Sequence, residues 1–87
     1  LQERAVGETA TVAGLCLRPH RPPTASGQVF VFLTLEDETG MAQVTVLPDV
    51  YARCGAALFG HALLAVTGVV EARGVGKILR ATDAWGA

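Results

Sequence analysis

The sequence predicts an all-β fold, a closed barrel of five short strands with one short helix between the third and the fourth strand. Its 87 residues suit a single domain, and 51% of them are hydrophobic, which is enough to form a core. Short runs of alternating apolar and polar residues predict strands that are buried on one face. Apolar residues take helical spacing over residues 50–58, so one helix is expected among the strands.

The first strand is expected over residues 9–17, a β-branched and aliphatic run that contains Gly14. A glycine within a strand marks a bulge, a bend or a close approach of two backbones. Because the first strand of a small barrel has to bend to serve both halves of the sheet, Gly14 fits a barrel. The next segment, residues 18–27, contains three prolines and predicts a loop.

Residues 29–36 and 41–47 are expected to form a β-hairpin around the acidic turn 37–40. Alternation places the aliphatic side chains on one, buried face: Val29, Val31, Leu33, Leu35, Ala42, Val44 and Val46. The other face carries two aromatic rings among mostly polar neighbours: Phe30, Phe32, Thr34, Glu36, Met41, Gln43, Thr45 and Leu47. A solvated face does not require two aromatic rings, so this second face is a candidate for binding.

A helix is expected over roughly 49–58 from the spacing of its apolar residues. Asp49 is the expected N-cap, and Gly55 is expected to weaken the last turn.

A fourth strand is expected over residues 62–71 and a fifth over 77–85, joined by a glycine-rich turn. Ile78 and Leu79 fall on opposite faces of the fifth strand, and Trp85 is expected to close the barrel or to dock onto a longer chain. Five strands with a helix between the third and the fourth is the element order of the OB-fold, a Greek-key barrel. An SH3-like barrel also has five strands but usually lacks that helix.

The composition argues against several classes of site. The net charge of -1 gives no overall basic signal for nucleic acid. Cys16 and Cys54 form no zinc-binding pattern and are expected to be free thiols, with a disulfide as the alternative. No nucleophile elbow, acid and base pair or phosphate-binding loop occurs, so no catalytic residue, metal or cofactor is expected. The acidic residues 36–38 are interpreted as turn formers.

The chain shows no signal peptide, and its longest apolar segment is too short to span a membrane. Because it begins with Leu1 and not with Met, residues 1–87 are expected to be one domain excised from a longer protein.

The basic residues concentrate in two segments that contain no acidic residue, 9–35 and 72–82. In an OB-fold the loops at these positions frame the open face of the second and third strands. Phosphate contacts from these loops and base stacking on the two phenylalanines therefore predict single-strand binding. The expected binding residues are Phe30, Phe32, Gln43, Thr45, Arg18, His20, Arg21, Arg73, Lys77 and Arg80. The alternatives are that the rings pack on a helix or another domain, and that the residues of 18–21 are ordinary solvated charges.

Three runs carry a family resemblance: G-L-C-L-R-P-H-R-P-P-T-A-S-G, F-L-T-L-E-D-E-T-G and V-T-V-L-P-D-V-Y. Together they resemble the OB domain of bacterial C-family DNA polymerases, which include the alpha subunit of DNA polymerase III, and especially its error-prone paralogue. The resemblance covers residues 10 to about 80. The sequence departs from the paralogue's pattern at Pro19, His20 and Pro23, and its second strand is longer by about two residues.

The resemblance implies a cytoplasmic DNA-directed DNA polymerase as the parent, acting in translesion synthesis, replication and DNA repair. Its catalytic aspartates would lie in an upstream palm domain, and a sliding clamp and mutasome proteins would be its partners. Residues 1–87 would be an accessory module that holds single-stranded template DNA. The alternative is a structural module that docks onto other polymerase domains or mutasome proteins.

The hairpin also resembles the anticodon-binding OB domains of class II aminoacyl-tRNA synthetases. There, an aromatic residue before the turn stacks on an anticodon base and a Gln on the next strand reads one, and Phe32 and Gln43 match these positions. Glu36 stands where those domains usually have Arg, so a tRNA-binding module is the weaker alternative.

Overall fold

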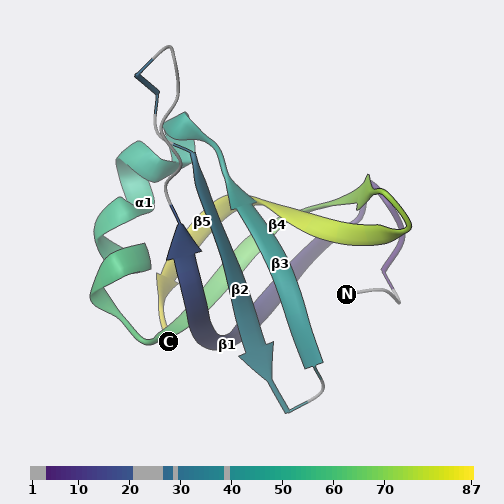
Figure 1. The fold of residues 1–87 in the computed structure, drawn as a ribbon, viewed down its shortest axis with the longest axis horizontal. Helices are drawn as coiled ribbons and strands as arrows, with labels where there is room; N and C mark the ends of the chain where they lie inside the picture. Colours follow the sequence, from purple (N-terminus) through teal and green to yellow (C-terminus); the bar gives the residue numbers. More distant parts are fainter. Residues whose placement is uncertain (1–3, 21–26, 29, 39) are drawn as a thin grey trace.

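The computed structural model describes residues 4–20, 27–28, 30–38 and 40–87. Within them, one helix and five strands follow in the order β1 (Thr9–His20), β2 (Val31–Asp37), β3 (Gly40–Val46), α1 (Pro48–Gly60), β4 (Leu63–Arg73) and β5 (Gly76–Gly86). The strands close into a barrel in the order β1-β2-β3-β5-β4 (Figure 1). The predicted all-β barrel, with its helix between the third and fourth strands, is confirmed.

Strand β1 bends at Gly14 and belongs to both halves of the barrel. It pairs antiparallel with β4 up to Leu15 and with β2 from Leu15 onward. A Cβ added at Gly14 would lie 2.5 Å from the carbonyl oxygen of Glu36, so only glycine lets the two backbones approach this closely. The prediction that Gly14 marks a bend in the first strand is confirmed.

Strand β1 continues to His20, so the prediction of a loop from residue 18 was wrong at its start. The pairing with β2 shifts between Leu17 and His20, and Pro19 lies at this irregularity. Among the described residues this half of β1 pairs with β2 and with no other strand, and a bulge on such a strand tolerates a proline that has no N–H to donate. Residues 21–26 lie outside the described part of the chain.

The hairpin of β2 and β3 buries one face and presents the other, as the alternation predicts. Val31, Leu33 and Leu35 of β2 are buried in the core together with Val44 and Val46 of β3. The two strands pair in register from Val31 with Val46 to Asp37 with Gly40. Val29, which was expected on the buried face, lies outside the described residues. This register fixes which side chains share the outer face.

Helix α1 begins at Pro48, and the expectation that Asp49 is its N-cap was wrong. Leu47 occupies the cap position without a side-chain hydrogen bond. Proline is favoured in the first turn because its ring presets φ and its missing N–H needs no partner there. Asp49 lies within the first turn, where its negative charge interacts favourably with the positive end of the helix dipole and stabilises the helix.

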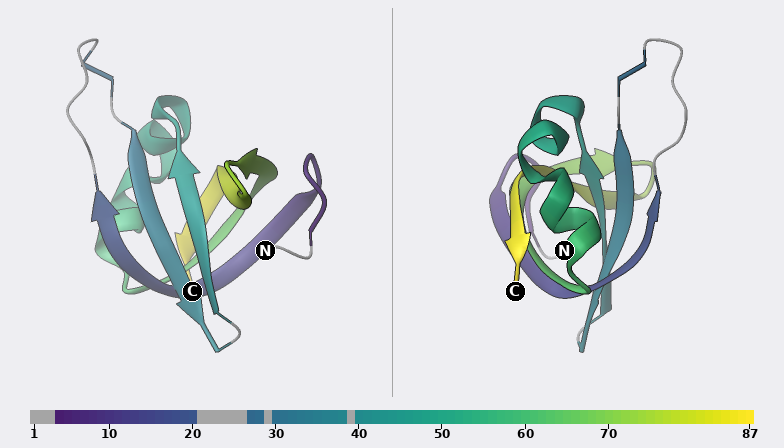
Figure 2. Two further views of the ribbon diagram at one scale, coloured as in Figure 1. Left: turned by 45° about the vertical axis from the view of Figure 1, so that its right-hand side comes forward. Right: turned by 90° about the vertical axis from the view of Figure 1, so that its left-hand side faces the viewer.

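The helix runs through Gly55, where the ring of Tyr51 lies so close that a Cβ would meet it at 2.9 Å. Its inner face buries Val50, Cys54 and Leu58 in the core, and the turned views show it lying against the barrel (Figure 2). No helix among the residues described is long and apolar enough to cross a membrane. Cys54 and Cys16 are free thiols.

Strands β4 and β5 form a long hairpin closed by a two-residue turn at Gly74 and Val75. The pairing shifts between Thr67 and Gly68, which marks a bulge in β4. The hairpin reaches away from the barrel and curls over beside β3 (Figures 1 and 2). Trp85 does not close the barrel, because 43% of it is exposed, and Ala84 is buried there instead.

Candidate nucleic-acid interface

A groove of about 210 Å³ lies on the outer face of the β2–β3 hairpin. The β2–β3 register places Phe32 opposite Thr45 and Thr34 opposite Gln43 on this face. The groove is lined by side chains of four strands and by the backbone around them: Phe32, Leu33, Thr34, Gln43, Val44, Thr45, Arg73 and Ile78. It therefore brings together four of the ten residues expected to bind, namely Phe32, Gln43, Thr45 and Arg73.

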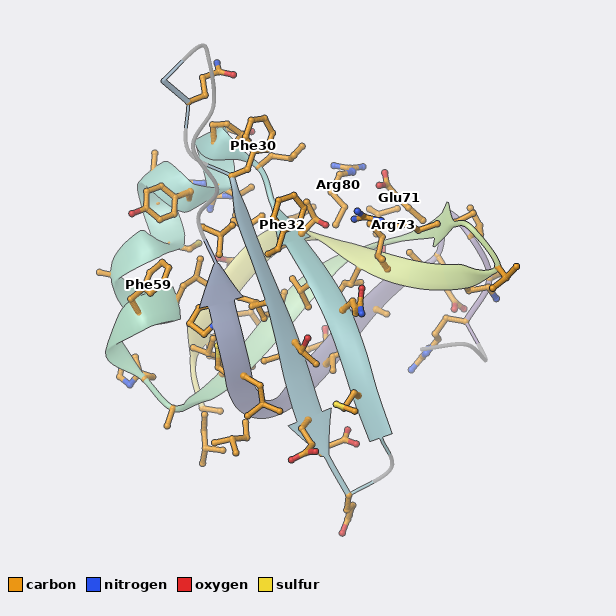
Figure 3. The ribbon with its side chains drawn as sticks, viewed as in Figure 1. Phe30, Phe32, Phe59, Glu71, Arg73 and Arg80 are labelled. Atoms are coloured by element: carbon orange, nitrogen blue, oxygen red, sulfur yellow. The ribbon has the colours of Figure 1, made fainter. Side chains whose placement is uncertain are left out.

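The guanidinium of Arg73 lies over the ring of Phe32, with its Cζ 5.9 Å from the ring centroid. Arg73 is the last residue of β4, so the curl of the β4–β5 hairpin is what brings it to β2 (Figure 3). The contact is within range of a cation–π interaction. It places a positive charge beside an aromatic surface, so a base can stack against the ring or against the guanidinium plane while the charge attracts its phosphate.

Gln43 and Thr45 supply hydrogen-bonding groups to the floor of the groove beside this ring. Gln43 is exposed, and its amide offers two donor hydrogens and one acceptor oxygen. Thr45 is half-buried, and its hydroxyl can donate or accept. Such groups can contact base edges or sugars of a strand that stacks on Phe32.

Phe30 directly precedes β2, and its ring lies on the same side of the sheet as Phe32 (Figure 3). It is half-buried but does not line the groove. A strand that leaves the groove toward this end of β2 would pass Phe30 next.

Arg80 lies at the edge of the groove, opposite Thr45 in the parallel pairing of β3 and β5. Its Nε donates to Oε2 of Glu71 at 2.7 Å, so the positive charge of Arg80 is paired with a carboxylate. Lys77 lies elsewhere, because it alternates with Ile78 along β5 and its Nζ donates to the backbone carbonyl of Arg4. The structure thus brings Arg80, but not Lys77, next to the groove.

The three basic residues expected between the first two strands are described only in part. Arg18 and His20 belong to the end of β1, and His20 is the Cα partner of Phe32. The end of β1 therefore runs beside the aromatic part of the groove. The side chains of Arg18 and His20, and all of Arg21, lie outside the described residues.

Two neighbours of the groove were missed by sequence reasoning. Ile78 lines it, and Glu71 pairs with Arg80. Alternation places Ile78 and Leu79 on opposite faces but does not say which face carries the groove. The Glu71–Arg80 contact depends on the register of the β4–β5 hairpin, and the turn at residues 74–75 sets that register.

A second hollow, of about 280 Å³, lies between β1 and the tip of the β2–β3 hairpin, with Arg4 and Asp37 at its edge. None of the expected binding residues whose side chains are described lines it. Among the described residues, no group of three or more His, Cys, Asp or Glu side chains could hold a metal ion.

Comparison with protein families assigns the barrel. A family described as an OB-fold nucleic acid binding domain matches residues 10–85. The chain belongs to this family. The match spans the five strands and the helix, including the groove, so nucleic-acid binding is the activity of the family to which this OB-fold domain belongs.

This OB-fold domain is also similar to proteins named error-prone DNA polymerase, as the resemblance predicts. The protein of Symbiobacterium thermophilum is 49% identical over 76 residues, which cover 85% of this chain and 7% of that protein. That of Ruegeria pomeroyi is 45% identical over 65 residues, covering 75% of this chain and 6% of the relative. That of Bdellovibrio bacteriovorus is 39% identical over 70 residues, covering 80% of this chain and 6% of the relative. The chain spans less than a tenth of the length of each of these relatives.

Proposed function

We propose that this OB-fold domain binds single-stranded DNA in the groove between the β2–β3 hairpin and the curled β4–β5 hairpin. The observation that carries the proposal is the Phe32 ring beneath the Arg73 guanidinium, at 5.9 Å, in a groove floored by Gln43 and Thr45. A base stacked on such a ring gains roughly 1–3 kcal/mol, whatever its identity. The bases of a duplex are already stacked on one another, so this mode of binding selects single strands.

The charge of the domain is compatible with this mode of binding. The net charge is only -1, and attraction of the phosphate backbone has to come from local cations. Arg73 lies at the groove, Arg18 and His20 belong to the end of β1, which runs beside Phe32, and Arg21 is the next residue in the sequence. We expect a modest affinity that falls as salt concentration rises.

For the parent protein, we propose an error-prone DNA polymerase, because the relatives that match most of this chain carry that name. In that context, residues 1–87 would be one domain of a much longer chain. The domain would hold template DNA near a catalytic centre that lies elsewhere in the polymerase, during replication or repair of damaged DNA. The cytoplasm would be its location, and a sliding clamp and mutasome proteins would be partners of the whole polymerase.

The second candidate function is docking onto another polymerase domain or a mutasome protein. The near-zero net charge and the pairing of Arg80 with Glu71 favour it, because both reduce attraction for phosphate. A tRNA-binding function is supported by the match of Phe32 and Gln43 to the synthetase hairpin and by the matching family, which is named for the tRNA anticodon.

Fluorescence anisotropy with labelled oligo-dT tests the proposed function. We expect Phe32→Ala to weaken binding about tenfold or more, since it removes the stacking surface. Phe59→Ala is the matched control, because Phe59 is 45% exposed on α1 and lies far from the groove (Figure 3). Thermal unfolding should show that Phe32→Ala still folds, since Phe32 is not part of the buried core.

Three outcomes separate the candidates. Salt-sensitive binding of oligo-dT that depends on Phe32 supports the proposal. No detectable binding of oligo-dT contradicts it and leaves docking as the better interpretation. Strong preference for an RNA stem-loop over oligo-dT would favour the tRNA-binding function.

A further inference from the structure

Arg80 and Glu71 form an ion pair beside the groove that neither the fold nor phosphate binding explains. The Nε of Arg80 donates to Oε2 of Glu71 at 2.7 Å, and the two side chains are 37% and 42% exposed. An exposed pair of this kind contributes little to stability. The β4–β5 hairpin that carries it is already held in register from Leu64 with Gly86 to Arg73 with Gly76.

The location of the pair connects it to the groove. Arg80 is the Cα partner of Thr45 and lies two residues from Ile78 on the same strand, and both Thr45 and Ile78 line the groove. Arg80, Glu71 and Arg73 are seen on the same side of the sheet as Phe30 and Phe32 (Figure 3). A strand stacked on Phe32 and passing toward Phe30 would therefore run close to Arg80.

The carboxylate of Glu71 makes this a poor site for phosphate. The two charges cancel, so the pair as a unit releases few counterions when a strand binds. A phosphate brought to Arg80 would also be repelled by Glu71, which lies within hydrogen-bonding distance of the same guanidinium. A neutral hydrogen-bond acceptor meets no such repulsion.

The orientation of the guanidinium favours two neighbouring acceptors. Among the described residues, Arg80 donates a hydrogen bond through Nε alone, so the N–H groups of its two terminal nitrogens remain available to a ligand. The bond to Glu71 fixes the plane in which this fork lies. Guanine presents O6 and N7 side by side, and the bidentate contact of Arg with these atoms is the commonest specific contact to a base.

We propose that Arg80, oriented by Glu71, recognises guanine in the single strand bound at the groove. Arg80 contacts the base, and Glu71 is a positioning residue that acts through Arg80. The inference rests on the proposed function, because it concerns the strand that stacks on Phe32. It adds a base preference to a groove whose stacking surface accepts any base.

The test compares alternating dT–dG and dT–dC oligonucleotides and oligo-dA with oligo-dT of the same length, by anisotropy over a series of salt concentrations, since none of these strands is self-complementary. Alternating sequences allow guanine to reach Arg80 whatever the register of the strand. We expect the dT–dG oligonucleotide to bind at least about fivefold tighter than oligo-dT. Arg80→Ala should abolish this preference, so that the dT–dG oligonucleotide binds no tighter than oligo-dT.

Glu71→Gln separates positioning from a merely structural role. It frees the charge of Arg80, so the preference for guanine should fall while the slope of log affinity against log salt steepens by about 0.7. Arg53→Ala is the control, because Arg53 makes a comparable surface pair with Asp83 at 3.8 Å and lies outside the groove. It should change neither quantity, and thermal unfolding should confirm that all three variants fold.

Several results would overturn the inference. If Arg80→Ala lowers the affinity for every oligonucleotide by the same factor and flattens the salt slope, Arg80 is a phosphate contact and does not recognise guanine. A preference for dT–dC or oligo-dA, or a guanine preference that survives both substitutions, would also contradict it. Each of these leaves the proposed function standing, whereas a domain that binds none of the oligonucleotides contradicts both.

Discussion

Replacing Gly14 with alanine should destabilise the barrel at the point where β1 passes from β4 to β2. The added Cβ would lie 2.5 Å from the carbonyl oxygen of Glu36, whereas ordinary contacts begin at 3.4 Å. The two backbones would have to separate by about 0.9 Å, which strains the pairing of Leu15 with Glu36 next to the bend. Overpacking of this kind typically costs about 1–3 kcal/mol.

The same substitution at Gly60 is a matched control. Gly60 is the last residue of α1, and a Cβ there would meet no atom within 4 Å. Alanine lowers the conformational entropy of the unfolded chain at either position, which stabilises the folded state by about 0.4–1 kcal/mol. Gly60→Ala should therefore be neutral or slightly stabilising, and the difference between the two variants isolates the contact with Glu36.

Urea unfolding followed by circular dichroism gives both free energies of unfolding. We expect Gly14→Ala to be less stable than Gly60→Ala by about 2 kcal/mol, which is the cost of the contact alone, because the entropic gain is common to both variants and cancels. For a domain of this size, that corresponds to a difference in Tm of roughly 8–16 °C. Equal stability of the two variants would refute the inference that close approach of the backbones at Gly14 shapes the barrel.

Three further predictions concern the groove, the helix and a thiol. Arg73→Lys should weaken oligo-dT binding and keep its salt dependence, because the charge stays but the planar group over Phe32 is lost. Arg73→Ala should weaken binding and also reduce the salt slope by about 0.7, because the charge is removed. Equal anisotropy curves for the two variants would contradict this prediction. Gly55→Ala should displace the Tyr51 ring, which a Cβ would meet at 2.9 Å, and so stabilise the domain less than Gly60→Ala does in the same urea titration. Burial raises the pKa of the Cys16 thiol, so the free energy of unfolding should fall as pH rises through this raised value. Iodoacetamide should also modify Cys16 more slowly in the folded domain than in the urea-unfolded chain. Equal modification rates by mass spectrometry would argue against burial of Cys16.

The sequence predicts the hairpin at the centre of the site because its side chains alternate with a period of two. That alternation correctly separates the buried Val31, Leu33 and Leu35 from Phe32 on the outer face. Gly14 could be interpreted as a bend because a strand glycine has few other uses. Element order then suffices to indicate the barrel.

The rest of the site depends on contacts between distant residues. Arg73 reaches Phe32 only because the β4–β5 hairpin curls toward β3, and no local pattern encodes that curl. Glu71 is paired with Arg80 by a register that the turn sets, so its role could not be seen from the distribution of charge. The start of α1 was misplaced for a local reason, because Pro48 outweighs the capping preference of Asp49.

The measurement that tests the central claim most directly is chemical-shift mapping of the domain during titration with oligo-dT. Binding in the groove predicts saturable shifts at Phe32, Gln43, Thr45 and Arg73 that weaken as salt is added. Shifts confined to the outer face of α1, around Phe59, or the absence of any saturable shift, would contradict the claim that this face of the β2–β3 hairpin holds single-stranded DNA.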